Sequence, residues 1–301
     1  MASRKQLQLY DDHHAMLADG VRMRAYGEAI RRTVRPGDRV VDLGAGLGIL
    51  GFLALKAGAG HVYAIEKTDS IELARQVARA NGLEDRVTFF HGNSKDFQLD
   101  EPADLLLSET LGSFGLEENT LDFMLDARRR LLKPDGRVLP RALRVWVAPV
   151  CLPAAWQKVA FWREVCGLDF SPAVEEQLSR MAQADVGIEH LLASAQLYEQ
   201  VDLREHEHVR VARTLHFPVQ RGGTLHGVAG WFQVSLCEGV VLKTGPDAPP
   251  THWRQAFFPL REPVEVVPGD IFELSLELAP KGPRSDDTAV KLDFRCTQVG
   301  R

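Results

Sequence analysis

Two acidic residues flank a short glycine-containing segment, SETLGSFGLEE, in the first half of the chain. Glu109 follows an apolar run that is typical of a buried strand, and Glu118 stands nine residues further on. A loop bent at Gly112 and Gly115 brings both carboxylates around one small cation. A planar guanidinium suits such a pair because it bonds carboxylates bidentately. A second interpretation stays open for Glu118, namely that it and Glu117 interact only with the N-terminus of the next helix.

A glycine-rich turn follows the apolar run DRVVDLG and forms a second candidate site. Glycines between a strand and a helix let a ligand approach the backbone closely. The third position of the strict dinucleotide fingerprint is Ile49 here, which weakens a pyrophosphate-binding interpretation. The spacing resembles motif I of class I methyltransferases, whose ligand carries no phosphate. The residues that carry this likeness are Asp42, Gly44, Gly46 and Gly48.

Residues that follow the next two strands extend this candidate cofactor site. Glu66 ends HVYAIE, and a carboxylate at that strand tip accepts hydrogen bonds from both hydroxyls of a ribose. Ser94 and Lys95 follow the third strand and are placed for an adenine ring. The alternative is a tight turn with Glu66 as a surface residue. The combination of Asp42, the glycines and Glu66 favours cofactor binding.

The elements that must position these residues alternate between strand and helix from Asp38 to about Val147. This rhythm predicts an α/β Rossmann-like domain with an open, largely parallel sheet and helices on both faces. Ligands of such sheets bind at the carboxyl ends of the strands. The expected strands are DRVVDLG, HVYAIE, RVTFFHG, ADLLLSE and GRVLPRALRVWV, and the expected helices cover 47–57, 70–81 and 118–132.

The pattern changes after Val150. A helical stretch is expected at about 155–200, and from Val201 onward short strands are separated by Pro and Gly. Such strands indicate an antiparallel β-barrel or sandwich. The chain is therefore expected to divide into an N-terminal helical segment (1–37), a Rossmann-like cofactor-binding domain (38–148) and a β-barrel-like substrate domain (149–301) with a helical arm.

The composition is that of an ordinary globular protein, with 301 residues, 45% of them hydrophobic and 26% charged. The net charge of −5 and the lack of a basic stripe argue against a nucleic-acid partner. No apolar stretch approaches the length of a membrane span, so we expect no membrane partner and a cytoplasmic protein. The four cysteines form no C-x-x-C pair, and no metal site is expected.

Taken together, the motifs resemble those of the protein arginine N-methyltransferases. SETLGSFGLEE is similar to the double-glutamate loop of that family, with the same nine-residue separation. Thr251-His252-Trp253 resembles its THW loop, and HHAMLADGVR (13–22) resembles the segment that leads into its first helix. GVAGWFQVSL and KLDFRC fit its barrel domain. The likeness spans nearly the whole chain in the same order, and two separated motifs are more specific than one.

This resemblance implies an arginine side chain in a protein or peptide as the substrate. Glu109 and Glu118 would clamp its guanidinium, and His252 would pair with Asp19 to order the active site. Met16 would pack near the reacting centre. Trp253 belongs to the same substrate side, where it is expected mainly to pack.

For the cofactor, the resemblance implies S-adenosyl-L-methionine. It also implies a homodimer that forms through the helical arm, although the arm has the alternative role of a cap on the barrel. The residues implied to hold the cofactor are Arg22 at its carboxylate, Glu66 at its ribose, and Gly44, Gly46 and Gly48 along its length.

Some positions depart from the pattern of the family. Thr110 and Ser113 stand where aromatic residues are usual, and Ser3 and Leu7 stand where tyrosines are expected, so the pocket loses aromatic walls. Two alternatives to protein arginine methylation follow: methylation of a small guanidine or amino-acid-like metabolite, and a non-catalytic cofactor-binding scaffold. The intact acidic and histidine positions argue against the scaffold. A dehydrogenase is disfavoured because of Ile49.

Overall fold

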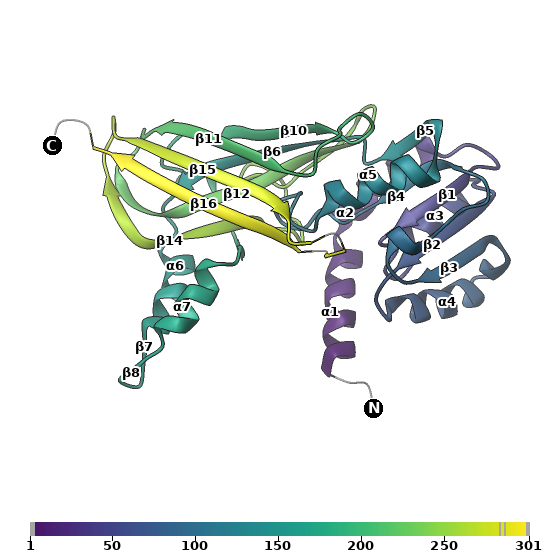
Figure 1. Ribbon diagram of the computed structural model, residues 1–301, viewed down its shortest axis with the longest axis horizontal. Coiled ribbons are helices and arrows are strands. Elements are labelled where there is room, and N and C mark those ends of the chain that lie inside the picture. The colour runs from purple at the N-terminus through teal and green to yellow at the C-terminus, as the bar shows by residue number, and fades with distance from the viewer. Residues whose placement is uncertain (1–3, 283, 286, 299–301) are drawn as a thin grey trace.

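Two lobes lie side by side in the computed structural model (Figure 1), which describes residues 4–282, 284–285 and 287–298. The first lobe contains a five-stranded parallel sheet with the order β3-β2-β1-β4-β5. The strands at its centre, β1, β2 and β4, are mostly apolar and buried, as parallel strands covered on both faces are. The predicted Rossmann-like sheet is confirmed. The strands are β1 Arg39–Leu43, β2 His61–Glu66, β3 Val87–His91, β4 Ala103–Ser108 and β5 Leu132–Leu139.

The helices of this lobe connect and cover the strands. The three helices predicted between strands are present, and each is shorter than expected by one or two residues at one or both ends. The 1–37 segment forms two helices, although Ser3 and the side chain of Leu7 lie outside the described part of the structure. The helices are α1 Arg4–Ala18, α2 Gly20–Thr33, α3 Ile49–Lys56, α4 Ser70–Ala80 and α5 Thr120–Leu131, with short 3-10 turns η1 Glu84–Arg86 and η2 Ser94–Asp96.

The second lobe is built from antiparallel strands, as predicted. One sheet has the order β10-β6-β12-β14-β9 with β13 paired to β12, and a second sheet has the order β11-β15-β16. Alternate side chains of β15 are buried, which places one face of the second sheet on the core. The strands are β6 Ala142–Val150, β9 Ala182–Ala184, β10 Gln196–Asp202, β11 Val211–Pro218, β12 Gly223–Cys237, β13 Val240–Lys243, β14 Gln255–Val266, β15 Ile271–Pro280 and β16 Thr288–Thr297.

GRVLPRALRVWV forms two strands instead of the single strand expected. Its first part belongs to β5, which pairs in parallel with β4, whereas its second part is β6, which pairs antiparallel with β10 and β12. The chain passes from one sheet to the other between Leu139 and Ala142. The predicted domain boundary at 148/149 therefore falls inside β6.

The arm projects from the second lobe (Figure 1) and is less helical than predicted. Helices α6 Pro153–Ala160 and α7 Ser171–Leu178 flank the turn η3 Phe161–Arg163 and a two-stranded ribbon of β7 Glu164–Val165 and β8 Leu168–Asp169. The prediction of helix as far as residue 200 is wrong beyond α7. There β9 pairs with β14 and β10 pairs with β6, and η4 Ile188–His190 lies between them. These strands depend on partners far away in the sequence, which local periodicity does not reveal.

Three features are absent from the described residues. None of the described helices is both long and apolar enough to cross a membrane. No group of three or more His, Cys, Asp or Glu side chains there is arranged to hold a metal ion. The four cysteines form no disulfide.

Candidate active site

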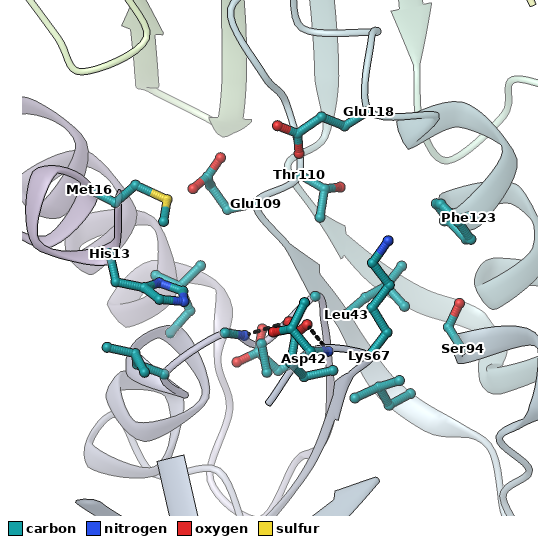
Figure 2. Close-up of a pocket in the computed structure, with 18 of the residues that line it drawn as sticks. His13, Met16, Asp42, Leu43, Lys67, Ser94, Glu109, Thr110, Glu118 and Phe123 are labelled. Carbon is teal, nitrogen blue, oxygen red and sulfur yellow. Dashed lines mark hydrogen bonds between the residues drawn. The ribbon is translucent and has the colours of Figure 1, made fainter. Parts of the chain in front are cut away.

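A cavity of about 600 Å³ opens at the carboxyl edge of the parallel sheet (Figure 2). Its walls come from α1 and α2, the glycine turn after β1, the ends of β2 and β3, and the loop between β4 and α5. This is the place where open parallel sheets bind ligands. The predicted site residues that line it are Met16, Arg22, Asp42, Gly44, Gly46, Glu66, Ser94, Glu109 and Glu118.

The glycine turn has a backbone that only glycine adopts easily. Gly44 and Gly46 have φ values of 69° and 54°, in the left-handed region. A Cβ on Gly44 would lie 2.6 Å from the Thr110 methyl carbon, and one on Gly46 would lie 2.8 Å from the His13 ring. The turn therefore exposes bare backbone to the cavity, as a closely bound ligand requires.

Asp42 holds the start of α3 in place behind this turn. Its Oδ2 accepts a hydrogen bond of 2.8 Å from the backbone N–H of Gly51, and its side chain is buried. Burial, with Glu66 and Glu109 nearby, raises the pKa of Asp42 to about 7. Gly48 does not line the cavity; it is the N-cap residue of α3, with a φ of 81°.

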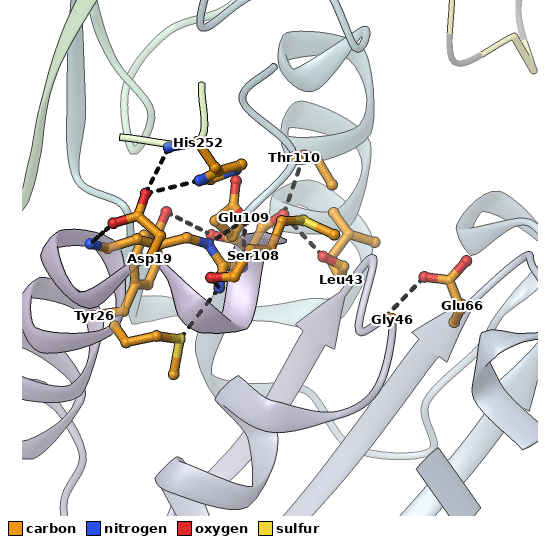
Figure 3. Close-up of polar contacts among 12 residues, drawn as sticks. Asp19, Tyr26, Leu43, Gly46, Glu66, Ser108, Glu109, Thr110 and His252 are labelled. Carbon is orange, nitrogen blue, oxygen red and sulfur yellow. Dashed lines mark hydrogen bonds and ion pairs between the residues drawn. The ribbon is translucent and has the colours of Figure 1, made fainter. Parts of the chain in front are cut away.

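Glu66 lies at the tip of β2 and faces the glycine turn. Its Oε2 accepts from the backbone N–H of Gly46 at 2.9 Å (Figure 3), and its Oε1 accepts from that of Thr68 at 2.8 Å. These two bonds fix the carboxylate at the cavity wall. The remaining lone pairs of its oxygens can accept further hydroxyl donors.

Arg22 and Glu109 form a buried ion pair. The Nε of Arg22 donates to Oε2 of Glu109 at 2.8 Å, and Nη2 donates to the same oxygen. Both side chains are about 5% exposed. The sequence assigned Arg22 to the cofactor and Glu109 to the substrate, and the structure brings the two into direct contact between those regions.

Asp19 joins the second helix to the THW loop, 233 positions away (Figure 3). Its Oδ1 accepts from the backbone N–H groups of Val21 and Arg22, which caps α2. Its Oδ2 accepts from the backbone N–H of His252 and pairs with His252 Nδ1, both at 2.9 Å. Burial opposes the charge of Asp19, but the hydrogen bonds from Arg22 and His252 outweigh it and lower the pKa. The predicted pairing of Asp19 with His252 is present.

Asp19, His252, Trp253 and Lys95 do not line the cavity among the described residues. Trp253 is buried and packs edge-on against Phe232 at 5.3 Å between ring centroids. Lys95 donates to Asp122 at 2.6 Å. Trp253 thus has a packing environment, and Lys95 is engaged by a carboxylate on α5.

The double-glutamate loop brings its two predicted residues to the same cavity. Glu109 and Glu118 both face it from above in Figure 2. Glu118 does not cap α5, because that helix begins at Thr120 with Asn119 as its N-cap. Glu118 as a whole residue is exposed, but protein atoms crowd around its carboxyl, and this desolvation, with repulsion from Glu109, raises its pKa to about 7.

Glu117 and His13 are among the lining residues that the sequence did not reveal as site residues. Glu117 was treated only as a neighbour of a helix terminus, yet it lines the cavity, and both its oxygens accept from the backbone N–H of Phe114, at 2.9 and 2.7 Å. Desolvation and the adjacent Glu118 raise the pKa of Glu117 to about 8. His13, from α1, covers the glycine turn (Figure 2). The paired glutamates were the available signal for Glu117, whereas His13 needed the tertiary structure.

The parallel sheet, its glycine turn and the acidic strand tip define a class I methyltransferase. Residues 35–166 match a model described as a methyltransferase domain, and residues 142–299 match one described as the arginine methyltransferase oligomerization subdomain. The chain therefore belongs to the protein arginine N-methyltransferase family. Its methyl donor is S-adenosylmethionine.

Individual relatives agree with this assignment. Over 89% of this chain and 72% of the relative, the sequence is 30% identical to probable protein arginine N-methyltransferase 6 of Arabidopsis thaliana. The PRMT1 enzyme–prozyme complex of Trypanosoma brucei with AdoHcy superimposes with a TM-score of 0.82, at 26% identity over 96% of this chain and 93% of that one. Arabidopsis thaliana protein arginine methyltransferase 10 gives a TM-score of 0.79, at 27% identity over the same shares.

Proposed function

We propose that this protein transfers a methyl group from S-adenosylmethionine to a guanidino nitrogen of arginine in a protein or peptide. One observation carries the proposal. Glu109 and Glu118 face the same cavity that holds the glycine turn and Glu66. A cation held by the two carboxylates is therefore adjacent to a ligand held by the turn.

The residues of the first lobe fit the cofactor. The turn at Gly44 and Gly46 offers backbone without side chains, Glu66 presents a carboxylate for ribose hydroxyls, and Arg22 offers a guanidinium for a carboxylate. Ser94 lines the same cavity and would contact the adenine ring. S-adenosylmethionine supplies an electrophilic methyl group when it is bound.

The acidic residues hold and orient the substrate. Arg22 already bonds Glu109 through two of its nitrogens, so Glu109 accepts a guanidinium in this position. Two carboxylates draw the positive charge to one part of the substrate guanidinium and leave one terminal nitrogen free to attack. That nitrogen would form a bond to the methyl carbon while the bond from this carbon to the donor sulfur breaks and S-adenosylhomocysteine leaves, and the methylated nitrogen must then release one proton. Glu118 accepts this proton, because its pKa of about 7 matches neutral solution.

The Asp19–His252 pair contributes by holding other parts of the site in place. It ties the start of α2, which carries Arg22, to the THW loop. His252 does not line the cavity among the described residues, so we assign it an ordering role instead of proton transfer.

We further propose that the protein forms a homodimer through its arm. Phe161, Leu168 and Phe170 are 59%, 62% and 36% exposed and all lie on the arm, and apolar side chains exposed together mark an interaction surface. The matched model of the second lobe is described as an oligomerization subdomain. A cytoplasmic location remains a prediction from the sequence.

The proposal is tested with radiolabelled S-adenosylmethionine, arginine-rich peptides and cell lysate split into macromolecular and small-molecule fractions. We expect label on arginine in protein, and at least about a hundredfold loss of it in Glu109→Gln. The exposed Glu84→Gln serves as the matched control. Calorimetry checks that Glu109→Gln still binds the cofactor, since this change leaves Arg22 without its carboxylate.

Each alternative has its own outcome. Label confined to the small-molecule fraction would move the function to methylation of a guanidine metabolite. Cofactor binding without label in any fraction would favour the scaffold. Full turnover of Glu109→Gln would refute the assignment of Glu109.

A further inference from the structure

The tip of the β15–β16 hairpin reaches from the second lobe to the first (Figure 1). Strands β15 and β16 pair over ten residue positions, from Ile271↔Thr297 to Pro280↔Thr288. The far end of this hairpin contacts the segment 116–119, which carries Glu118 and lies about 170 positions earlier in the chain. The segment that carries Glu118 is thus in contact with a hairpin that is remote from it in sequence.

Thr288 makes three hydrogen bonds to this segment. Its hydroxyl accepts from the backbone N–H of Asn119 at 3.1 Å and donates to the carbonyl of Leu116 at 3.2 Å. Its own backbone N–H donates to the carbonyl of Glu117 at 3.2 Å. Glu118 is the residue between these contacts, so the backbone is held on both sides of it.

The residues before Thr288 add two more contacts. The carbonyl of Ser285 accepts from the side-chain amide of Asn119 at 2.7 Å. Arg284 forms a bidentate ion pair with Asp96, at 2.8 and 3.0 Å, on the η2 turn whose first residue, Ser94, lines the cavity. Asp287 itself lines the cavity. The hairpin tip therefore contacts both the segment 116–119, which carries Glu118, and the η2 turn beside the proposed cofactor site.

The segment 116–119 has little regular structure of its own to set the direction of Glu118. It lies in a turn before α5, and Asn119 has a φ of 55°, a region that residues other than glycine rarely adopt. Asparagine adopts this region more readily than most residues, and surrounding contacts stabilise it further. Since Asn119 is buried and bonded to Thr288 and Ser285, the hairpin supplies those contacts.

We propose that Thr288 is a positioning residue, which holds Glu118 in the orientation that binds the substrate guanidinium, and that the β15–β16 hairpin thereby completes the active site. This inference rests on the proposed role of Glu118. It assigns a catalytic contribution to a strand of the second lobe that does not touch the reacting atoms.

The test compares Thr288→Val with Thr288→Ser and with Thr297→Val. Valine keeps the shape and the backbone N–H but removes the hydroxyl, serine keeps the hydroxyl, and Thr297 is an exposed residue at the other end of the same strand. We measure kcat and KM for an arginine-rich peptide, the cofactor Kd, Tm, and hydrogen exchange of the Asn119 amide.

For Thr288→Val we expect faster exchange at Asn119 and about a fivefold lower kcat/KM for the peptide, with the cofactor Kd within about twofold of wild type. Thr288→Ser should restore both, and Thr297→Val should change neither. A fall in Tm without the kinetic loss would indicate a merely structural contact and overturn the proposal. Unchanged exchange at Asn119 would overturn it as well.

If the proposed function itself is wrong, the measurements differ from those that would overturn the role of Thr288. In that case the wild-type enzyme itself labels no arginine peptide. The Asn119 exchange of Thr288→Val and Thr288→Ser then decides whether Thr288 holds the segment, independently of the substrate.

Discussion

Asp19 is the most sharply testable link between the two lobes. Its two carboxylate oxygens have different partners: Oδ1 caps α2 and Oδ2 binds His252. Asp19→Ser keeps a good N-cap residue but is too short to reach His252, whereas Asp19→Ala loses both contacts. The pair of variants therefore separates the cap from the link between lobes.

The expected losses follow from the burial of these groups. The side chain of Asp19 is 4% exposed and that of His252 is 16% exposed, so their contacts are little screened by solvent. Hydrogen bonds to a charged group contribute about 2 kcal/mol, and an N-cap contributes about 1 kcal/mol. We expect the free energy of unfolding to fall by about 2 kcal/mol in Asp19→Ser and by about 3 kcal/mol in Asp19→Ala.

Urea denaturation measures both values, and its pH dependence provides an independent check. The pKa of Asp19 is lowered in the folded protein, so its contribution is fully present above the ordinary aspartate value of about 3.8. The contribution is lost as the pH falls through the lowered native pKa. The stability difference between wild type and Asp19→Ser should thus be constant from about pH 7 to pH 5 and shrink below about pH 4.

Activity gives the functional side of the same test. Arg22 lies in the first turn of the capped helix, so Asp19→Ala should raise the KM for the cofactor more than Asp19→Ser does. The reasoning is refuted if Asp19→Ser is as stable as wild type, or if the stability difference is the same at pH 3 as at pH 7.

Three further outcomes are expected. The kcat/KM for an arginine peptide should rise between about pH 6 and pH 8, because the pKa of Glu118 is about 7 and only its charged form attracts a guanidinium; Glu118→Gln should remove this step from the pH profile. Gly44→Ala should weaken cofactor binding in calorimetry by at least about tenfold, since the added Cβ would lie 2.6 Å from Thr110 at a positive φ, and an unchanged Kd would contradict this account. Leu168→Glu on the arm should reduce the mass in sedimentation and leave Tm within about 2 °C of wild type, because that side chain is exposed in the single chain; an unchanged mass would argue for a cap instead of a dimer interface.

The sequence by itself determined the chemistry of the cavity and the order of the first lobe. Strand, glycine turn and helix are local features, and the carboxyl ends of parallel strands meet at one edge by geometry. For that reason Gly44, Glu66 and Glu109 could be placed at one site before the structure was known, and all three line the cavity. Glu118 was placed there by the resemblance of SETLGSFGLEE to the double-glutamate loop of the family.

Only the tertiary structure decided which of these residues touch one another. The contacts of Arg22 with Glu109 and of Thr288 with the Glu118 segment join positions 87 and 169 residues apart, and no local pattern encodes such pairs. The pairing of Asp19 with His252 was expected only because the motifs resemble those of the family, and the structure shows its geometry. The strands β9 and β10 were missed for the same reason, because a strand is stabilised by its partner more than by its own propensity. The sequence thus supplied the acids and bases of the site, and the packing of the two lobes decided their partners, their burial and their pKa values.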